Sequence, residues 1–327
     1  MALLDVKNLC VGIKRGKTCL MAVKGLNLSI NAGEITAIAG ESGCGKTLSA
    51  LSVMRLLPPS VEITGGTIQF TKRDGEVLNV NSISEKMMSK TRGKEIAMIF
   101  QEAKQALNPL MKIGRQIAET LELHGENKKT AMQAALDLLQ KLQFPQPEKI
   151  LHLWPHQLSG GMCQRVMIAV ASICRPSLLI ADEPTSSLDA ENKNHILTLL
   201  RQINREFGTA VLFISHDLDT VRNFCSRILI MYSGSIIEEG PAQRIFSAPL
   251  HPYTKALLGI IPLKEQRGQP LAGIKGNAPL IEDVFAGCRF APRCPKAKEL
   301  CATKFPSITE IKAGNKVRCH YPEITNG

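Results

Sequence analysis

A chain of 327 residues, 44% of them hydrophobic, can bury one large core or two smaller ones, and this composition excludes a disordered protein. No apolar run reaches the length of a membrane span, and the first residues lack a secretory signal, so we expect a protein that stays in the cytoplasm. The net charge is +11, and residues 241–327 hold 13 Lys or Arg against 6 Asp or Glu. Such a basic region suits anionic lipid, nucleic acid or an acidic partner, or is an ordinary solvated surface.

Short apolar runs predict strands, and runs with helical spacing predict helices. In chain order, the first half contains strands 3–13 and 34–39, a helix 46–57, a hairpin 66–70 and 75–80, and a strand 95–100. A helix-rich block 110–175 follows, and then strand 177–182, helix 190–206, strand 209–214, helix 217–225 and strand 227–232. The alternation predicts a parallel sheet covered by helices, interrupted by an inserted helical block. The pattern ends after Gly240 and Pro241, where we place a boundary.

A glycine-rich loop between the strand 34–39 and the next helix matches the pattern G-x-x-x-x-G-K-[ST]. Its residues are Gly40, Glu41, Ser42, Gly43, Cys44, Gly45, Lys46 and Thr47. Glycines let backbone N–H groups turn towards phosphate oxygens, and the helix N-terminus adds positive charge. We expect Lys46 to reach the β- and γ-phosphates and the Thr47 hydroxyl to bind Mg²⁺. A chance glycine turn is disfavoured because the loop lies between a strand and a helix.

Two further strands end in polar residues. The apolar strand 178–182 ends in Asp182, followed by Glu183, which suits a carboxylate on Mg²⁺ beside a general base for water. The alternative is an acidic cap for the next helix. His216 follows the strand 209–214, where it is either structural or a contact to the γ-phosphate.

The segment Ser159, Gly160 and Gly161 precedes a predicted helix and suits a second anion site, although Ser-Gly-Gly is also a common loop. In this order, these motifs resemble the nucleotide-binding subunits of ABC transporters. The resemblance covers about residues 3–240. It implies that 40–47 is Walker A, 178–183 is Walker B with Glu183 catalytic, and 158–162 is the signature, with Met162 in place of Gln. It also implies a Q-loop glutamine at Gln101, a D-loop at 186–189 ending in Asp189, and a switch histidine at His216.

Three segments are similar to the dipeptide, oligopeptide and nickel importer subfamily: 101–109, 158–165 and 251–254. The resemblance implies an α/β P-loop NTPase cassette over 1–240. Its parts are a mostly parallel core sheet, an antiparallel β subdomain and a helical subdomain at about 105–175, followed by a Cys-rich extension over 241–327. It further implies a second ATPase subunit, by resemblance a paralogue, together with two transmembrane permeases and an extracytoplasmic binding protein. Ser159 then completes the partner's ATP site, and the chain sits peripherally on the cytoplasmic face of the membrane.

Four of the ten cysteines lie within 32 residues: Cys288, Cys294, Cys301 and Cys319. Their spacing lacks the tight pairs of structural zinc and suits an iron–sulfur cluster. By resemblance to the subfamily's extension we expect a four-iron cluster, with zinc as the alternative. Disulfides are disfavoured in a reducing cytosol, and four unrelated thiols are disfavoured by the clustering. Arg289, Arg293 and Lys298 lie close enough in sequence to offset a cluster's charge.

The function expected is ATP hydrolysis, with Mg²⁺, that drives peptide import. Import of nickel or a metal chelate is the first alternative, and a soluble ABC ATPase acting on nucleic acid is a weaker one. A P-loop kinase does not explain residues 158–162. One departure from the family concerns the base: Ile13 stands where an aromatic residue usually stacks on adenine, and no Phe, Trp or Tyr precedes Phe70. We therefore expect modest selectivity among nucleotide bases.

Overall fold

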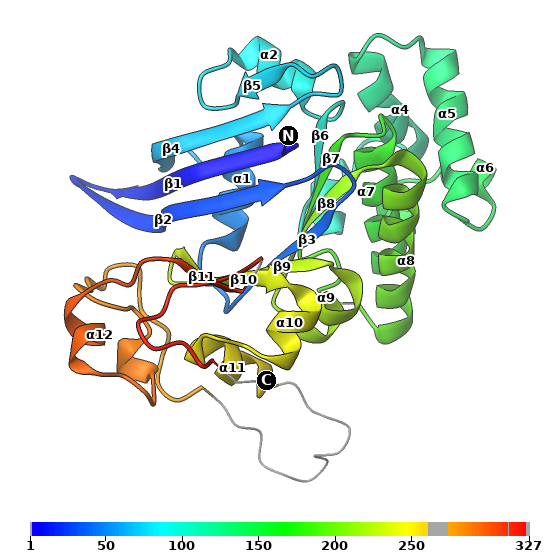
Figure 1. Cartoon of the computed structure of the whole chain (residues 1–327). Coiled ribbons are helices and arrows are strands. Elements are labelled where there is room, and N and C mark those ends of the chain that lie inside the picture. Colours follow the sequence, from blue (N-terminus) through cyan, green and yellow to red (C-terminus); the bar gives the residue numbers. More distant parts are fainter. Residues whose placement is uncertain (1, 187, 261–273, 313, 325–327) are drawn as a thin grey trace. The chain divides into compact units, whose positions relative to one another are not determined.

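The computed structural model describes residues 2–186, 188–260, 274–312 and 314–324, which form two compact units (Figure 1). The first unit comprises Met1–Asp5, Ser29–Glu34 and Gln69–Leu212, and the second comprises Val6–Leu28, Ile35–Ile68 and Phe213–Gly327. Four strands run through both units: β1 (Leu4–Arg15), β2 (Thr18–Ile30), β4 (Val61–Thr71) and β8 (Ala210–Ser215).

In the second unit, strands run in the order β11-β12-β10-β9-β3-β8. The core of this sheet is β3 (Ile35–Ala39), which pairs in parallel with β9 (Arg227–Tyr232), with Thr36 opposite Arg227. A two-residue turn, Ser233 and Gly234, joins β9 to the antiparallel β10 (Ser235–Pro241). Both turn residues have positive φ, 42° and 83°, which matches the right-handed twist of a hairpin.

The far edge of this sheet comes from the end of the chain. Strand β12 (Asn315–Val317) pairs antiparallel with β10 on one side and with β11 (Thr309–Lys312) on the other. The helices of the unit are α1 (Lys46–Met54), α9 (Leu218–Phe224), α10 (Ala242–Ser247), α11 (Pro252–Leu258), the 3₁₀ turn Ala291–Arg293 and α12 (Glu299–Thr303). A separate sheet has the order β2-β1-β4 in this unit.

In the first unit, β8 neighbours β7 (Leu178–Asp182), which pairs in parallel with β6 (Ile96–Ile99). Every residue of β6 and β7 is buried, as expected for parallel strands covered on both faces. Short β5 (Val77–Asn79) pairs antiparallel with β4. The helices are α2 (Glu85–Thr91), α3 (Ala103–Ala106), α4 (Ile113–Leu123), α5 (Lys128–Lys141), α6 (Pro147–Ile150), the 3₁₀ turn Pro155–Gln157, α7 (Gly160–Ser172) and α8 (Ala190–Phe207).

Helices α4 to α7 lie within the helix-rich block 110–175 expected from the sequence, and in Figure 1 they lie together with α8, which matches the separately predicted helix 190–206. Helix α5 shows why this segment is helical. Asn127 accepts a hydrogen bond from the Thr130 N–H at 2.9 Å and so caps its first turn, and its buried residues fall on one face at helical spacing. The expected α/β architecture is therefore observed.

The structure also differs from the prediction in several places. The first helix ends at Met54 instead of residue 57, because Arg55 adopts a left-handed conformation and closes it as a C-cap. Strands β2, β10, β11 and β12 and helices α2, α10, α11 and α12 were not predicted. Proline signals after Gly240 suggested the end of regular structure, yet Pro252 occupies the first turn of α11, where its missing N–H costs nothing.

Candidate functional site

The phosphate loop, residues 40–47, joins the buried strand β3 to helix α1 in the second unit. Three of its glycines have positive φ: Gly40 at 155°, Gly43 at 77° and Gly45 at 107°. A Cβ on Gly40 would lie 2.2 Å from the Met231 carbonyl oxygen, and one on Gly45 would lie 3.0 Å from that of Ala22. Glycine is therefore required by close packing as well as by conformation.

Lys46 lies within the curve of this loop, with only 6% of its surface exposed. Its Nζ donates to the Gly40 carbonyl at 2.8 Å and to the Glu41 carbonyl at 2.9 Å. The loop's backbone thus holds an ammonium group at the N-terminus of α1, next to the exposed Thr47. This combination of charge, helix end and turned backbone suits a bound polyphosphate.

Cys44, a residue of the same loop, has a buried side chain, and this burial raises the pKa of its thiol. Its carbonyl accepts a hydrogen bond of 3.0 Å from the Gly234 N–H in the β9–β10 turn. The loop is therefore tied to the neighbouring hairpin. His216, the other predicted contact to the nucleotide in this unit, is exposed immediately after β8, a neighbour of β3 in the sheet.

In the first unit, Gln101 and the acidic pair follow the same end of two paired strands. Ile99 stands opposite Ala181 in the parallel pairing of β6 with β7, and Gln101 and Glu183 each come two residues later in the chain. Asp182 is 2% exposed at the end of β7. Glu183 has a φ of 49°, and such left-handed strain in a residue other than glycine is found disproportionately at functional sites.

Ser159 caps helix α7 by accepting a 3.3 Å hydrogen bond from the Met162 N–H, and Ser159 and Gly160 are both exposed. A Cβ on Gly161 would lie 2.8 Å from Asn192 Oδ1. Asn192 donates its side-chain N–H to Asp189 Oδ2 at 2.7 Å, and its backbone N–H to Oδ1 at 2.9 Å.

These hydrogen bonds lower the pKa of the Asp189 carboxyl. Asn192 therefore links two motifs predicted separately, and sequence analysis missed it. The only signal was its position three residues after a capping Asp. Ser187, part of the same predicted loop, lies outside the described residues.

The predicted residues fall into two groups, one in each unit. The first unit contains Gln101, Ser159, Gly160, Gly161, Asp182, Glu183 and Asp189, and the second contains residues 40–47, His216 and the four clustered cysteines.

The four clustered cysteines are free thiols in the second unit. Burial raises the pKa of Cys319 to about 11, and the nearby thiols of Cys288, Cys294 and Cys301 contribute to this rise. Burial likewise raises the pKa values of Cys288 and Cys294, with smaller contributions from the neighbouring thiols. All four lie in the second unit, and among the described residues no group of three metal-ligating side chains is arranged to hold an ion.

The cations near these cysteines are engaged with other groups. Arg289 donates to the Ser233 carbonyl at 3.1 Å and to Ser235 Oγ at 2.7 Å. Lys298 lies over the Tyr321 ring, 4.3 Å from its centroid. They fasten residues 286–303 (the cysteine-bearing segment, which contains Cys288, Cys294 and Cys301) to the rest of the unit.

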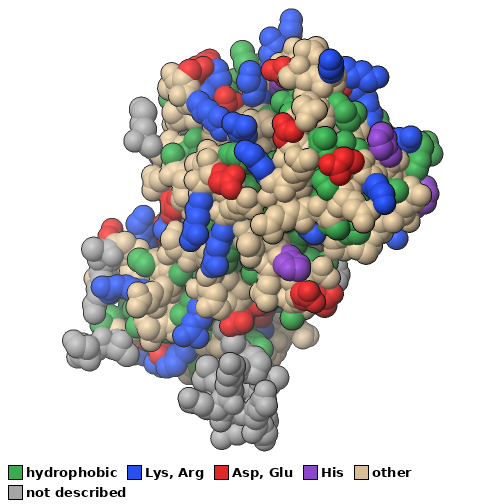
Figure 2. All heavy atoms as spheres, turned by 90° about the vertical axis from the view of Figure 1, so that its right-hand side faces the viewer, with side chains coloured by type: hydrophobic (Ala, Val, Ile, Leu, Met, Phe, Trp, Pro, Cys, Tyr) green, Lys and Arg blue, Asp and Glu red, His purple; other side chains and the backbone are tan. Residues whose placement is uncertain are grey.

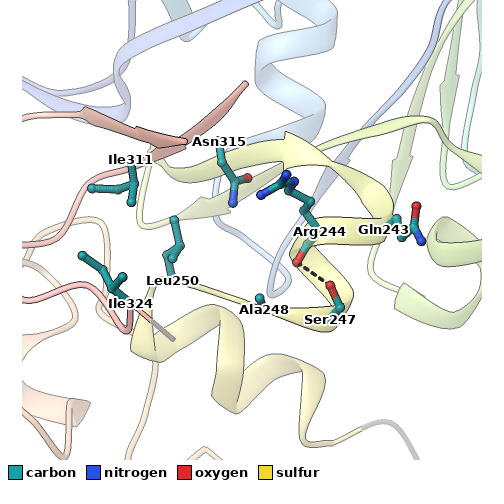
Figure 3. A pocket seen from close by; sticks show the side chains of 8 residues that line it. All are labelled: Gln243, Arg244, Ser247, Ala248, Leu250, Ile311, Asn315 and Ile324. Atoms are coloured by element: carbon teal, nitrogen blue, oxygen red, sulfur yellow. Dashed lines mark hydrogen bonds between the residues drawn. The ribbon is translucent and has the colours of Figure 1, made fainter. Parts of the chain in front are cut away.

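A cavity of about 350 Å³ lies elsewhere in the second unit (Figure 3). Its lining residues are Gln243, Arg244, Ser247, Ala248, Leu250, Ile311, Asn315 and Ile324, none of which is a predicted site residue. Asn315 is 4% exposed, and a Cβ on Gly240 would lie 1.8 Å from its Oδ1. This oxygen packs against the β10 backbone.

The surface charge is mixed on the face drawn in Figure 2, where Lys and Arg alternate with Asp, Glu and apolar side chains. Among the helices that the structure describes, none has both the length and the hydropathy of a membrane span.

Comparison with known proteins gives consistent matches over nearly the whole chain. A sequence profile described as "ABC transporter" matches residues 23–186, and one described as "Oligopeptide/dipeptide transporter, C-terminal region" matches 237–301. The oligopeptide transport ATP-binding protein AppD of Bacillus subtilis is 43% identical, with 97% of this chain and 96% of AppD covered. The dipeptide transport ATP-binding protein DppD of Escherichia coli is 41% identical, with 98% and 97% covered.

Solved structures match the fold over a shorter length. The dimeric ATP-binding cassette MJ0796 bound to ADP and Pi is 28% identical with a TM-score of 0.64, covering 73% of this chain and 98% of that one. The cbiO1 component of Clostridium perfringens is 26% identical, also with a TM-score of 0.64, and covers 76% and 91%.

Proposed function

This chain belongs to the ABC transporter family and is an ATPase, and from that premise we propose that it energises the import of peptides across the cytoplasmic membrane. The predicted family and cassette fold are thereby confirmed. The observation that carries the proposal is the match to peptide-transport ATP-binding proteins over 97–98% of this chain, including the C-terminal region. Import of nickel or a metal chelate is the second candidate, since the sequence motifs are those of a subfamily that includes nickel importers.

The ATP-binding residues are proposed from the geometry of each unit. Residues 40–47 hold the phosphates, with Lys46 supplying the positive charge and Thr47 a ligand for Mg²⁺. Asp182 and Gln101 lie at one end of two paired strands, where they suit the Mg²⁺ shell. Glu183 beside them suits the base that activates water.

Hydrolysis requires a second cassette in this proposal. Ser159, Gly160 and Gly161 present an exposed helix N-terminus, which would bind the γ-phosphate of ATP held by the partner's phosphate loop. Asp189 positions that segment through Asn192, and His216 would orient the attacking water in its own site. The matched cassette bound to ADP and Pi is itself a dimer.

The proposed partners are a paralogous ATPase subunit, two transmembrane permeases and an extracytoplasmic peptide-binding protein. The chain would sit at the cytoplasmic face of the membrane, held there by the permeases. No nucleic acid partner is proposed. The domain division expected from the sequence, with the cassette over 1–240 and the extension over 241–327, remains a proposal.

We further propose that Cys288, Cys294, Cys301 and Cys319 bind a four-iron cluster, with zinc as the alternative. Burial, with smaller contributions from neighbouring thiols, raises the pKa values of Cys288, Cys294 and Cys319, and a bound cation would stabilise their thiolate forms. Iron and sulfide analysis of anaerobically purified protein, compared with Cys294→Ser, tests this. One equivalent of zinc without iron would exclude the iron–sulfur proposal.

The transport proposal is tested with the complete complex in vesicles. Peptide presented with the binding protein should stimulate ATP hydrolysis, and nickel or a chelate should not. The Glu183→Gln variant should bind ATP and fail to turn it over. Stimulation by nickel alone would transfer the assignment to the second candidate, and unchanged hydrolysis by Glu183→Gln would remove Glu183 as the base.

A further inference from the structure

We propose that Arg293 and Tyr253 are positioning residues of the ATP site, because they hold Glu41 of the phosphate loop from the C-terminal part of the chain. They would set both the shape of the loop and its net charge. The proposal concerns the ATPase itself and does not depend on the transported substrate.

Arg293 forms a two-pronged ion pair with Glu41. Its Nη1 lies 2.9 Å from Glu41 Oε2 and its Nη2 lies 3.1 Å from Oε1. The Arg293 side chain is 7% exposed and that of Glu41 is 25% exposed, so solvent screens the pair only in part. Nε also donates to the Lys275 carbonyl at 3.1 Å, and Nη1 to Tyr232 Oη at 3.3 Å, which fixes the plane of the guanidinium.

Tyr253 holds the same loop residue through its backbone. Its hydroxyl oxygen accepts a hydrogen bond of 3.1 Å from the Glu41 N–H. The Tyr253 side chain is fully buried, with its ring 4.5 Å from that of Tyr232 and 5.4 Å from that of Phe290. Helix α11 therefore binds the main chain of Glu41, and the cysteine-bearing segment binds the side chain of the same residue.

The contacts continue from Glu41 to the lysine that is expected to bind phosphate. The Glu41 carbonyl oxygen accepts from Lys46 Nζ at 2.9 Å, and the carbonyl before it, on Gly40, accepts at 2.8 Å. A shift of Glu41 would thus move two of the acceptors that orient Lys46. Energetic coupling between groups of this kind follows such chains of packed, hydrogen-bonded residues.

The negative charge of Glu41 is a second reason why Arg293 should affect ATP binding. Glu41 places a carboxylate inside a loop that binds anions, and two negative charges repel strongly where solvent screening is reduced. Arg293 neutralises that carboxylate. Removing the guanidinium alone would leave Glu41 opposing the nucleotide, whereas removing both charges would not.

The experiment measures ATP affinity in the full-length protein by titration with a fluorescent ATP analogue, and KM and kcat in the assembled complex. Arg293→Gln should raise the Kd and KM for ATP on the order of fivefold or more, with a smaller change in kcat. Arg293→Lys should recover part of the loss. Glu41→Gln combined with Arg293→Gln should bind ATP more tightly than Arg293→Gln alone.

Arg318→Gln is the matched control. Arg318 also immediately precedes a cysteine and donates to two backbone carbonyls, those of Ile236 and Pro306, neither of which is in the phosphate loop. It should leave KM within about twofold. Tyr253→Phe, which deletes one oxygen from a packed ring, gives an independent arm and should raise KM roughly two- to threefold.

Equal KM values for Arg293→Gln and Arg318→Gln would overturn the proposal. The proposal would also be overturned if Tyr253→Phe left the KM for ATP unchanged and the double variant bound ATP no more tightly than Arg293→Gln alone. If Arg293→Gln does not fold, Arg293→Lys and Tyr253→Phe decide the question by the same measurements.

Discussion

The packing of Phe290 should control whether the cysteine-bearing segment stays docked. Its ring is 1% exposed and meets Tyr232 at 5.4 Å and 87°, Tyr253 at 5.4 Å and 69°, and His251 at 5.8 Å and 56°. Truncating a buried Phe to Ala costs about 3–5 kcal/mol, and each lost edge-to-face pair accounts for about 0.5–1.5 kcal/mol of such costs. We therefore expect Phe290→Ala to lower the free energy of opening of this segment by about 3 kcal/mol.

Hydrogen exchange followed by mass spectrometry measures this opening directly. At about 1.4 kcal/mol per factor of ten, amides in residues 286–303 should exchange on the order of a hundredfold faster in Phe290→Ala. The chain's single Trp, Trp154, lies in the first unit, so tryptophan fluorescence would not report on this segment.

Phe305→Ala is the control for that measurement. Phe305 is 36% exposed and is covered mainly by Arg289 and Arg318, whose guanidinium carbons lie 4.7 and 5.2 Å from its centroid. Partial burial of the ring and its contacts with two half-buried guanidinium groups predict a loss of about 1–2 kcal/mol. Equal exchange in the two variants, or less than about a fivefold effect of Phe290→Ala, would refute the packing argument.

Three further predictions concern the pH dependence of stability, the contact with the adenine base and the phosphate loop. Burial lowers the pKa of His251 to about 3 from 6.5, so the unfolded chain binds more protons between these values and stability should rise as pH increases from 3 to 6.5; the pH slope of local exchange should flatten in His251→Asn, which can still cap the Tyr253 N–H. Ile13→Tyr should tighten ATP binding by about 1–3 kcal/mol if adenine lies on this residue, and an unchanged Kd would place the base elsewhere. Gly40→Ala should abolish nucleotide binding while leaving the circular dichroism spectrum unchanged, because the added carbon meets the Met231 carbonyl; ordinary binding would show that the loop can shift.

Local chemistry explains what could be predicted from sequence. A phosphate loop needs glycines at set positions and a helix directly after them, so eight consecutive residues identify it. Parallel strands covered on both faces appear as uninterrupted apolar runs, which is why β6, β7 and β8 were placed within two residues. The family followed from the order of these motifs along the chain, which needs no knowledge of distances.

The missed helices show where local signals mislead. Helices α10 and α11 have six and seven residues, too few for a helical period to stand out, and a proline that starts a helix resembles one that ends a domain. Asn192 was missed for another reason. Its role depends on Gly161, a residue 31 positions earlier that reaches it only in the folded unit.

The phosphate loop, its glycines and the acidic residues at the end of β7 were thus determined by sequence alone, because each depends on neighbours within a few positions. Only the tertiary structure decided that Glu41 is held by Arg293, 252 residues away, and that Tyr253 bonds the same residue's N–H. A salt bridge or hydrogen bond between distant segments leaves no periodicity in the chain. It forms because β9, α11 and the cysteine-bearing segment bury Tyr232, Tyr253 and Phe290 against one another, and that packing sets which charges meet.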